Sequence, residues 1–157
     1  MFCSSIADLN GDGLEDVYLC QIAGLRNRLW LRTADGKLKE APASGLEVRE
    51  NTSAALFLDF DADGDRDAVL TTAIGVVFFA NNGAGVFEEK IRLENIPHGF
   101  GMASSDYDRD GDLDLFIGNR NGATFFFRNT AEPGSNTSAF TYSQGGNENP
   151  FEIPDVG

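Results

Sequence analysis

Acidic side chains recur at alternate positions in three nine-residue loops, residues 8–16, 59–67 and 106–114. Counted from the first Asp of each loop, positions 1, 3, 5 and 9 carry Asp in every copy, except that Asn10 takes position 3 of the first. Alternate side chains of an extended chain point to the same face, so these oxygens can converge on one point. Hard oxygen ligands in this number are the set that Ca²⁺ prefers.

Positions 6 and 7 complete the loop pattern. Glycine at position 6 permits the positive φ that turns the chain back, and position 7 offers a backbone carbonyl. We therefore predict that each loop binds one Ca²⁺, which gives about three per chain. The predicted ligands are Asp8, Asn10, Asp12, Leu14, Asp16, Asp59, Asp61, Asp63, Asp65, Asp67, Asp106, Asp108, Asp110, Asp112 and Asp114.

Bare turns, other metals and the EF-hand fit the loops less well. A single loop of this composition is as easily a solvated turn, but three copies in register would leave carboxylates repelling one another without a cation. Mg²⁺ demands a strict octahedron, and zinc needs His or Cys at ligand spacing, which the loops lack. An EF-hand requires Glu at position 12, where the three loops have Leu19, Leu70 and Ile117.

Short apolar and β-branched segments surround every loop and predict four strands per repeat. The first strand enters the loop and the second leaves it, and two more follow. The expected strands are 4–7, 17–20, 29–31 and one around Leu38; then 54–60, 68–72, 76–79 and 86–87; then 102–107, 115–118, 124–127 and 140–142. Four strands in a unit of about 45 to 50 residues are typical of a propeller blade.

The repeat lengths divide the chain into three expected blades. They cover residues 1–48, 49–97 and 98–145, and residues 146–157 are expected to lead into a further blade. The predicted fold is all-β, a partial β-propeller of four-stranded antiparallel blades. Aromatic residues fall on the third strand of each repeat, in Trp30, 78–79 and 125–127, where we expect core between blades rather than a ligand platform.

The repeats resemble the FG-GAP/VCBS family, the calcium-loop β-propellers that include the integrin α-subunit head and secreted proteins similar to cartilage acidic protein. The third repeat is the most specific, because Phe100 and Gly101 precede its acidic loop and Gly118 follows it. The resemblance covers residues 1–143 and implies calcium loops in the hairpin between the first two strands of a blade. The other two repeats depart from this Phe-Gly pair. The second has Ser53-Ala54 in its place, and the first has Phe2-Cys3.

Three blades are fewer than the four to eight or so that close a propeller. We therefore expect the remaining blades to belong to a longer parent chain, and several copies assembling into a ring are the alternative. The resemblance implies an extracellular or periplasmic protein. The first residues lack the basic and apolar regions of a signal peptide, and no segment is long and apolar enough to insert into a membrane.

The net charge and the residue composition argue against several classes of function. A formal net charge of −13 argues against nucleic acid or an anionic membrane as partner. His98 is the single His and no nucleophile and base stand out, so we expect no enzyme activity. The expected function is a scaffold with structural Ca²⁺ that binds an extracellular protein or glycan in adhesion. The alternative is the non-catalytic propeller of a larger secreted enzyme, such as a polysaccharide-degrading one.

Two details concern the first loop. Cys3 and Cys20 lie on either side of it, and a disulfide and a pair of buried thiols are equally compatible with their positions. The loop also supplies one carboxylate fewer than the others, because Asn10 replaces an Asp. We therefore expect it to bind Ca²⁺ most weakly.

Overall fold

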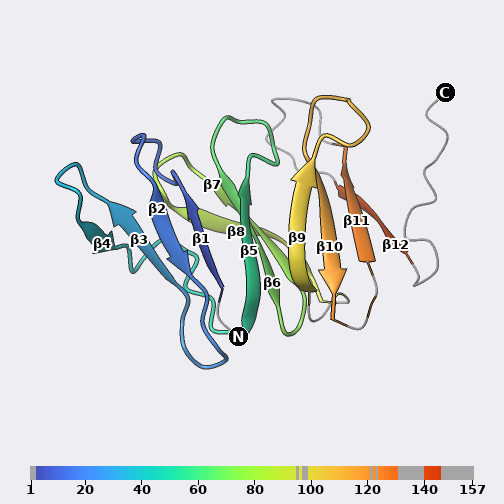
Figure 1. The fold of residues 1–157 in the computed structure, drawn as a ribbon, viewed down its shortest axis with the longest axis horizontal. Helices are drawn as coiled ribbons and strands as arrows, with labels where there is room; N and C mark the ends of the chain where they lie inside the picture. The colour runs from blue at the N-terminus through green and yellow to red at the C-terminus, as the bar shows by residue number, and fades with distance from the viewer. Residues whose placement is uncertain are drawn as a thin grey trace.

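The protein is described by a computed structural model that covers residues 3–94, 96, 99–120, 122 and 124–130, and the backbone of 140–145 (Figure 1). The described residues form strands, turns and loops, and no helix among them is long and apolar enough to cross a membrane. His98 and the expected lead-in at 146–157 lie outside the described residues.

In the part of the chain that the structure describes, twelve strands form three antiparallel sheets of four, and within each sheet the strands lie side by side in chain order. The sheets stand next to one another along the molecule, from the blue N-terminal sheet to the orange C-terminal one in Figure 1. This confirms the prediction of an all-β fold built from four-stranded blades. The strands are β1 (Ser4–Ala7), β2 (Asp16–Leu19), β3 (Arg28–Arg32), β4 (Leu38–Glu40), β5 (Thr52–Leu58), β6 (Asp67–Thr72), β7 (Val76–Asn81), β8 (Phe87–Leu93), β9 (Gly99–Ser105), β10 (Asp114–Asn119), β11 (Thr124–Asn129) and β12 (Phe140–Gly145).

Each acidic loop joins the first two strands of its sheet. The strand pairs close at Ala7 with Asp16, at Leu58 with Asp67 and at Ser105 with Asp114. The last Asp of every loop is therefore the first residue of the second strand. A strand and not a helix follows each loop, which agrees with the exclusion of an EF-hand. The largest boundary difference is β8, which continues to Leu93, well beyond the expected 86–87.

Alternation along the strands builds one apolar layer on each side of the middle sheet. In β7, Val77 and Phe79 face the first sheet, whereas Val76 and Phe78 face the third. Phe78 meets Phe127 of β11 with ring centroids 6.0 Å apart. The predicted core between blades is thus confirmed for the third-strand aromatics that are buried, Phe78, Phe79, Phe125 and Phe127.

Trp30 and Phe126 differ from that expectation. Both are only half-buried, and neither belongs to the two core clusters between the sheets. Each follows or precedes a core residue on its strand, so alternation turns it to the opposite face. Among the described residues, no sheet packs on that face of the first or the third blade. The guanidinium carbon of Arg28 instead lies over the Trp30 ring, 4.7 Å from the ring centroid.

Cys3 and Cys20 form a disulfide, which decides between the two alternatives left open by the sequence. Their Cα atoms are 5.0 Å apart, and the backbone N–H of Cys20 donates to the carbonyl of Cys3 at 2.9 Å. The bridge joins the entry to β1 with the end of β2. The hairpin that carries the first acidic loop is thus closed covalently at its open end.

Candidate metal sites

The Asp at position 9 fixes the shape of every loop. Its two carboxylate oxygens accept backbone hydrogen bonds, one from loop position 2 and one from the last residue of the third strand. It is fully buried in all three repeats. The donors are Leu9 and Arg32 to Asp16 at 2.9 and 2.7 Å, Phe60 and Asn81 to Asp67 at 3.0 and 2.8 Å, and Tyr107 and Asn129 to Asp114 at 3.0 and 2.9 Å.

Positive φ angles occur at two positions of each loop. Position 6 is glycine, as predicted, with φ of 82° at Gly13, 96° at Gly64 and 99° at Gly111. Position 4 is also left-handed, with φ of 72° at Gly11, 59° at Ala62 and 64° at Arg109. Sequence pattern does not indicate this second turn, because two of its three residues carry a side chain. One left-handed residue on each side of position 5 turns the backbone, so that the loop curls around its own carboxylates.

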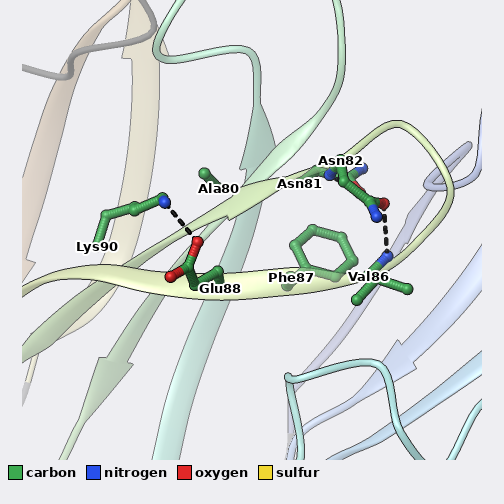
Figure 2. Close-up of a pocket in the computed structure, with 7 residues that line it drawn as sticks. All are labelled: Ala80, Asn81, Asn82, Val86, Phe87, Glu88 and Lys90. Atoms are coloured by element: carbon green, nitrogen blue, oxygen red, sulfur yellow. Dashed lines mark hydrogen bonds and ion pairs between the residues drawn. The ribbon is translucent and has the colours of Figure 1, made fainter.

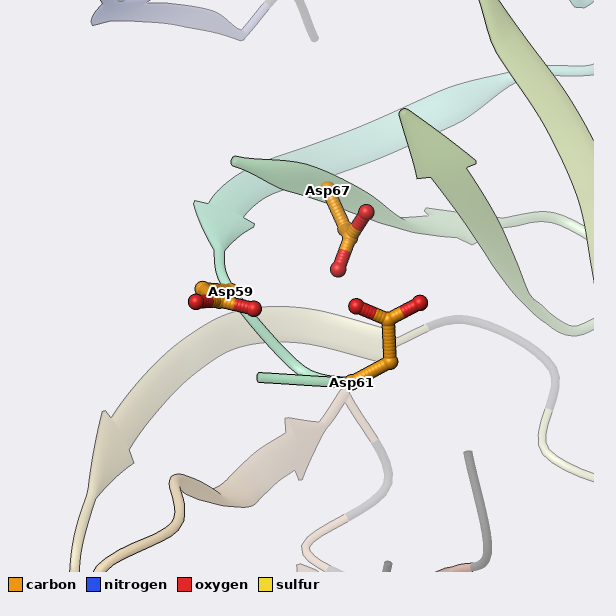
Figure 3. Close-up of side chains that lie close together, drawn as sticks. All are labelled: Asp59, Asp61 and Asp67. Carbon is orange, nitrogen blue, oxygen red and sulfur yellow. The ribbon is translucent and has the colours of Figure 1, made fainter. Parts of the chain in front are cut away.

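The second loop gathers three carboxylates at one point. Asp59, Asp61 and Asp67 each offer an oxygen within 4.8 Å of the others, and Figure 3 shows the three groups facing a common space. Asp61 is only 5% exposed, and its Oδ1 has no hydrogen-bond partner among the described residues. Burial raises the pKa of Asp67 to about 7. Burial, and then the nearby Asp63 charge, raises the pKa of Asp61 as well.

The third loop contains a second such group. Asp106, Asp108 and Asp110 also place one oxygen each within 4.8 Å of one another. The Asp108 side chain is 9% exposed, and its Oδ1 has no hydrogen-bond partner in the described structure. Its Oδ2 forms an ion pair with Nη2 of Arg128, which reaches the loop from β11. Burial also raises the pKa of Asp112, and hydrogen bonding and charge from Asp110 add to the shift.

The first loop differs at position 3, where Asn10 replaces a carboxylate and its amide donates within the loop. Asp8 accepts from the N–H groups of Gly11 at 2.9 Å and Gly13 at 2.8 Å. The Asn10 amide donates to Asp12 at 3.0 Å, and Leu14 N–H donates to the other oxygen of Asp12 at 2.8 Å. Groups of three close carboxylates occur among the described residues only in the second and third loops.

The structure thus brings six of the predicted ligands into two groups of three. One group is Asp59, Asp61 and Asp67, and the other is Asp106, Asp108 and Asp110. The other predicted ligands lie in the loops but outside these two groups. At position 7, Asp65 turns toward the β7–β8 hairpin, where a Cβ on Gly83 would come within 2.6 Å of its Oδ2. Its carboxylate therefore lies against the Gly83 backbone, and a side chain at that position would displace it.

Sequence reasoning missed the asparagines that tie the first and second loops to the next blade. Asn81 Nδ2 donates to the carbonyls of Leu9 and Arg66, both at 2.9 Å. Asn129 Nδ2 donates to the carbonyl of Phe60 at 2.7 Å. Both accepting carbonyls in the preceding blade stand at loop position 2. The available signal is an Asn after an aromatic third strand in two of the three repeats.

A pocket of about 250 Å³ lies on the β7–β8 hairpin (Figure 2). Its lining includes Asn81, Phe87 and the ion pair between Lys90 and Glu88. Ligand pockets usually measure about 300–1,000 Å³. The acidic loops, and not this pocket, are therefore the candidate functional site.

Comparison with known proteins agrees with the fold and the repeats. The sequence profile of the FG-GAP-like repeat matches residues 8–70 and again 59–117. One similar solved structure is a lectin from Agrocybe aegerita, described by its recognition of non-reducing terminal N-acetylglucosamine. It is 21% identical, with a TM-score of 0.57, and the match covers 88% of this chain but only 37% of the lectin. No curated protein matches the sequence significantly. The two profile matches together span more than half of the sequence, and the chain belongs to the FG-GAP-like repeat family.

Proposed function

We propose that this chain is a calcium-binding β-propeller module of an extracellular or periplasmic protein, in which Ca²⁺ is structural. Asp61 carries the proposal. A carboxylate buried to this degree needs a counter-charge or a full set of hydrogen bonds, and one Asp61 oxygen has no such partner among the described residues. The same Asp61 carboxylate belongs to the group formed with Asp59 and Asp67.

The donor set of the second loop fits calcium chemically. It consists of the carboxylate oxygens of three Asp residues and contains no nitrogen or sulfur ligand. Asp59, Asp61 and Asp67 would hold the ion. A bound Ca²⁺ would neutralise the buried charge, and the loop's left-handed turns at Ala62 and Gly64 keep the carboxylates aimed inward. Metal bound only to the folded loop stabilises the fold.

The outer face of the third blade supports the proposal of further blades. Tyr107 stands at loop position 2, as Phe60 does in the second blade, and in the sheet register Phe126 takes the place of Phe78. Phe60 and Phe78 are buried against the next blade, whereas Tyr107 is 39% exposed. A further blade packed on this face would cover the same apolar positions. We therefore propose that the chain forms part of a larger, non-catalytic propeller.

Location and partner complete the proposed function. The Cys3–Cys20 disulfide supports an oxidising compartment, where calcium is also abundant. We propose adhesion through a protein or glycan, and the lectin with the same fold makes a glycan a reasonable first probe. The second candidate is the propeller portion of a larger secreted enzyme. A catalytic domain in the same full-length chain would favour that candidate.

Calorimetric titration of the chelator-stripped chain with Ca²⁺, and separately with Mg²⁺, tests calcium binding. We expect two or three Ca²⁺ per chain, a weaker response to Mg²⁺ and a higher melting temperature with Ca²⁺. Asp61→Asn should remove one binding event, because it neutralises the buried ligand but keeps its size.

Asp35→Asn is the matched control. Asp35 lies on the exposed β3–β4 turn and pairs with Lys37, so its replacement removes one negative charge away from the loops. It should leave the stoichiometry unchanged. A folded chain that binds no Ca²⁺, or equal losses in the two variants, would refute structural calcium binding.

A further inference from the structure

Arg128 is the feature that separates the third loop from the other two. Of the ion pairs in the described structure, only Arg128–Asp108 involves a loop carboxylate. The Arg128 side chain is 49% exposed, whereas that of Asp108 is 9% exposed. A cation anchored at the protein surface therefore reaches a nearly buried acid inside a candidate metal site.

The sheet register shows that this cation is specific to one repeat. Leu115 pairs with Phe127 as Ala68 pairs with Phe79, so Arg128 corresponds to Ala80 in the second blade. The first blade has Leu31 at this place by the same register. Neither residue carries a charge, so the first two loops receive no cation from this position of the third strand.

We propose that Arg128 is a tethered counter-ion of the third loop that competes with a divalent cation for Asp108. The inference rests on the proposed calcium binding. The guanidinium supplies part of the positive charge that the Asp106, Asp108 and Asp110 group needs in the absence of metal. A metal ion that binds Asp108 must break or share this charge-assisted contact. The third loop is then stable without metal and fills only after the second.

This competition alters the order of affinities expected from carboxylate number alone. The second and third loops each supply four Asp residues at positions 1, 3, 5 and 9. By number of ligands the two loops should bind Ca²⁺ with equal affinity, but the contact between Arg128 and Asp108 lowers the affinity of the third loop. Losing the competitor should raise the Ca²⁺ affinity of that loop about tenfold, since the ion pair with Asp108 no longer opposes binding.

A site-resolved titration tests the proposal. The backbone amides of Gly64 and Gly111 stand at position 6 of the second and third loops, and their NMR resonances report each loop separately. In the wild-type chain we expect the Gly111 signal to shift at higher Ca²⁺ concentration than the Gly64 signal. In Arg128→Ala the Gly111 midpoint should fall about tenfold while the Gly64 midpoint stays unchanged.

Arg109→Ala is the matched control, because Arg109 belongs to the same loop but forms no ion pair in the described structure. Its removal should move the Gly111 midpoint much less. Arg128→Lys should retain most of the competition. If Arg128→Ala folds poorly, Arg128→Gln keeps the length of the side chain without its charge. Metal-free Arg128→Ala should also melt at a lower temperature than metal-free wild type.

Two results would overturn the inference and leave calcium binding intact. One is a wild-type chain in which Gly64 and Gly111 respond at the same Ca²⁺ concentration. The other is Arg109→Ala lowering the Gly111 midpoint as much as Arg128→Ala, which would make the effect one of net charge. If neither glycine responds in a folded chain, the proposed calcium binding itself is wrong.

Discussion

The side-chain amide of Asn81 donates a hydrogen bond to the backbone carbonyl of Leu9, 2.9 Å away, and so joins the second blade to the acidic loop of the first. Asn129 makes the same contact with Phe60 one blade further along. Each of these two loops is therefore held from two sides, by its own position-9 Asp and by the next blade.

Replacing Asn81 tests the strength of this joint. Asn81→Ala leaves the buried carbonyl of Leu9 and the more exposed carbonyl of Arg66 without their donor, and we expect the free energy of unfolding to fall by about 2 kcal/mol. Arg32→Ala is the control, since Arg32 stands at the same register position of the first blade but is exposed. It should cost at most about 0.5 kcal/mol. Denaturant unfolding measures both, and similar losses would contradict a specific joint.

The left-handed residue at position 4 makes a second prediction. Ala62 adopts φ of 59°, a conformation that costs a residue with a Cβ about 1–2 kcal/mol. Ala62→Gly should therefore stabilise the chain, by about 0.5–1 kcal/mol after the entropy of glycine is included. Gly64→Ala should destabilise it by about 1–2 kcal/mol through backbone strain alone, because a Cβ there meets no atom within 4 Å. Thermal melts of the metal-free chains measure both changes. A melting temperature lower for Ala62→Gly than for Gly64→Ala would contradict this account of loop strain.

The pH dependence follows from the raised carboxylate pKa values. Burial raises the pKa of Asp67 in the folded chain to about 7, from 3.8 in the unfolded one. The folded state then holds more protons between these values, so the stability contributed by protonated Asp67 is present below about pH 4 and is lost as the pH rises through 7. The metal-free chain should melt at a lower temperature at pH 8 than at pH 5.

Calcium should weaken or reverse this trend, because the metal binds ionised carboxylates and its stabilisation grows with pH. Asp61→Asn should also make the metal-free dependence shallower, since burial raises the pKa of Asp61 as well. A melting temperature of the metal-free wild type that increases from pH 5 to pH 8 would show that the buried acids are not the cause. Melts across this range, with chelator and with Ca²⁺, provide the measurement.

The disulfide gives a fourth prediction. It links residues 17 apart, and a covalent loop of this size stabilises a fold by about 3 kcal/mol. Reduction should lower the free energy of unfolding by about that amount. A Cys3→Ser/Cys20→Ser double variant should show the same loss and no further response to reductant. Unfolding curves that do not change on reduction would mean that the bridge contributes no stability.

Much of the fold follows from local pattern. The strand Ser4–Ala7 has the bounds that its sequence predicts, and the glycines at position 6 are left-handed as predicted, because strand alternation and turn chemistry act over a few residues. The same dependence on local pattern makes β8 appear too short in the sequence. Its charged residues Glu88, Glu89 and Lys90 are exposed on an outer strand, where no buried partner imposes an apolar pattern.

The candidate site is predictable in composition but not in arrangement. Alternation of Asp indicates the three loops, yet it gives no means of distinguishing the hydrogen-bonded Asp12 from the unsatisfied Asp61. Nor can it place Arg128 beside Asp108, since that contact joins separate strands and depends on sheet register. Contacts between distant segments are fixed by packing, which one sequence does not display.

The joints between blades have a consequence for how such a chain can lengthen. One repeat carries an acceptor, the carbonyl at loop position 2, and Asn81 and Asn129 show that it can also carry the matching donor. A tandem duplication of the gene segment for such a repeat copies both halves together. Each new copy is then complementary to its parent from the moment it arises, without compensating mutations on either surface. The first repeat has Arg32 at this position in place of Asn.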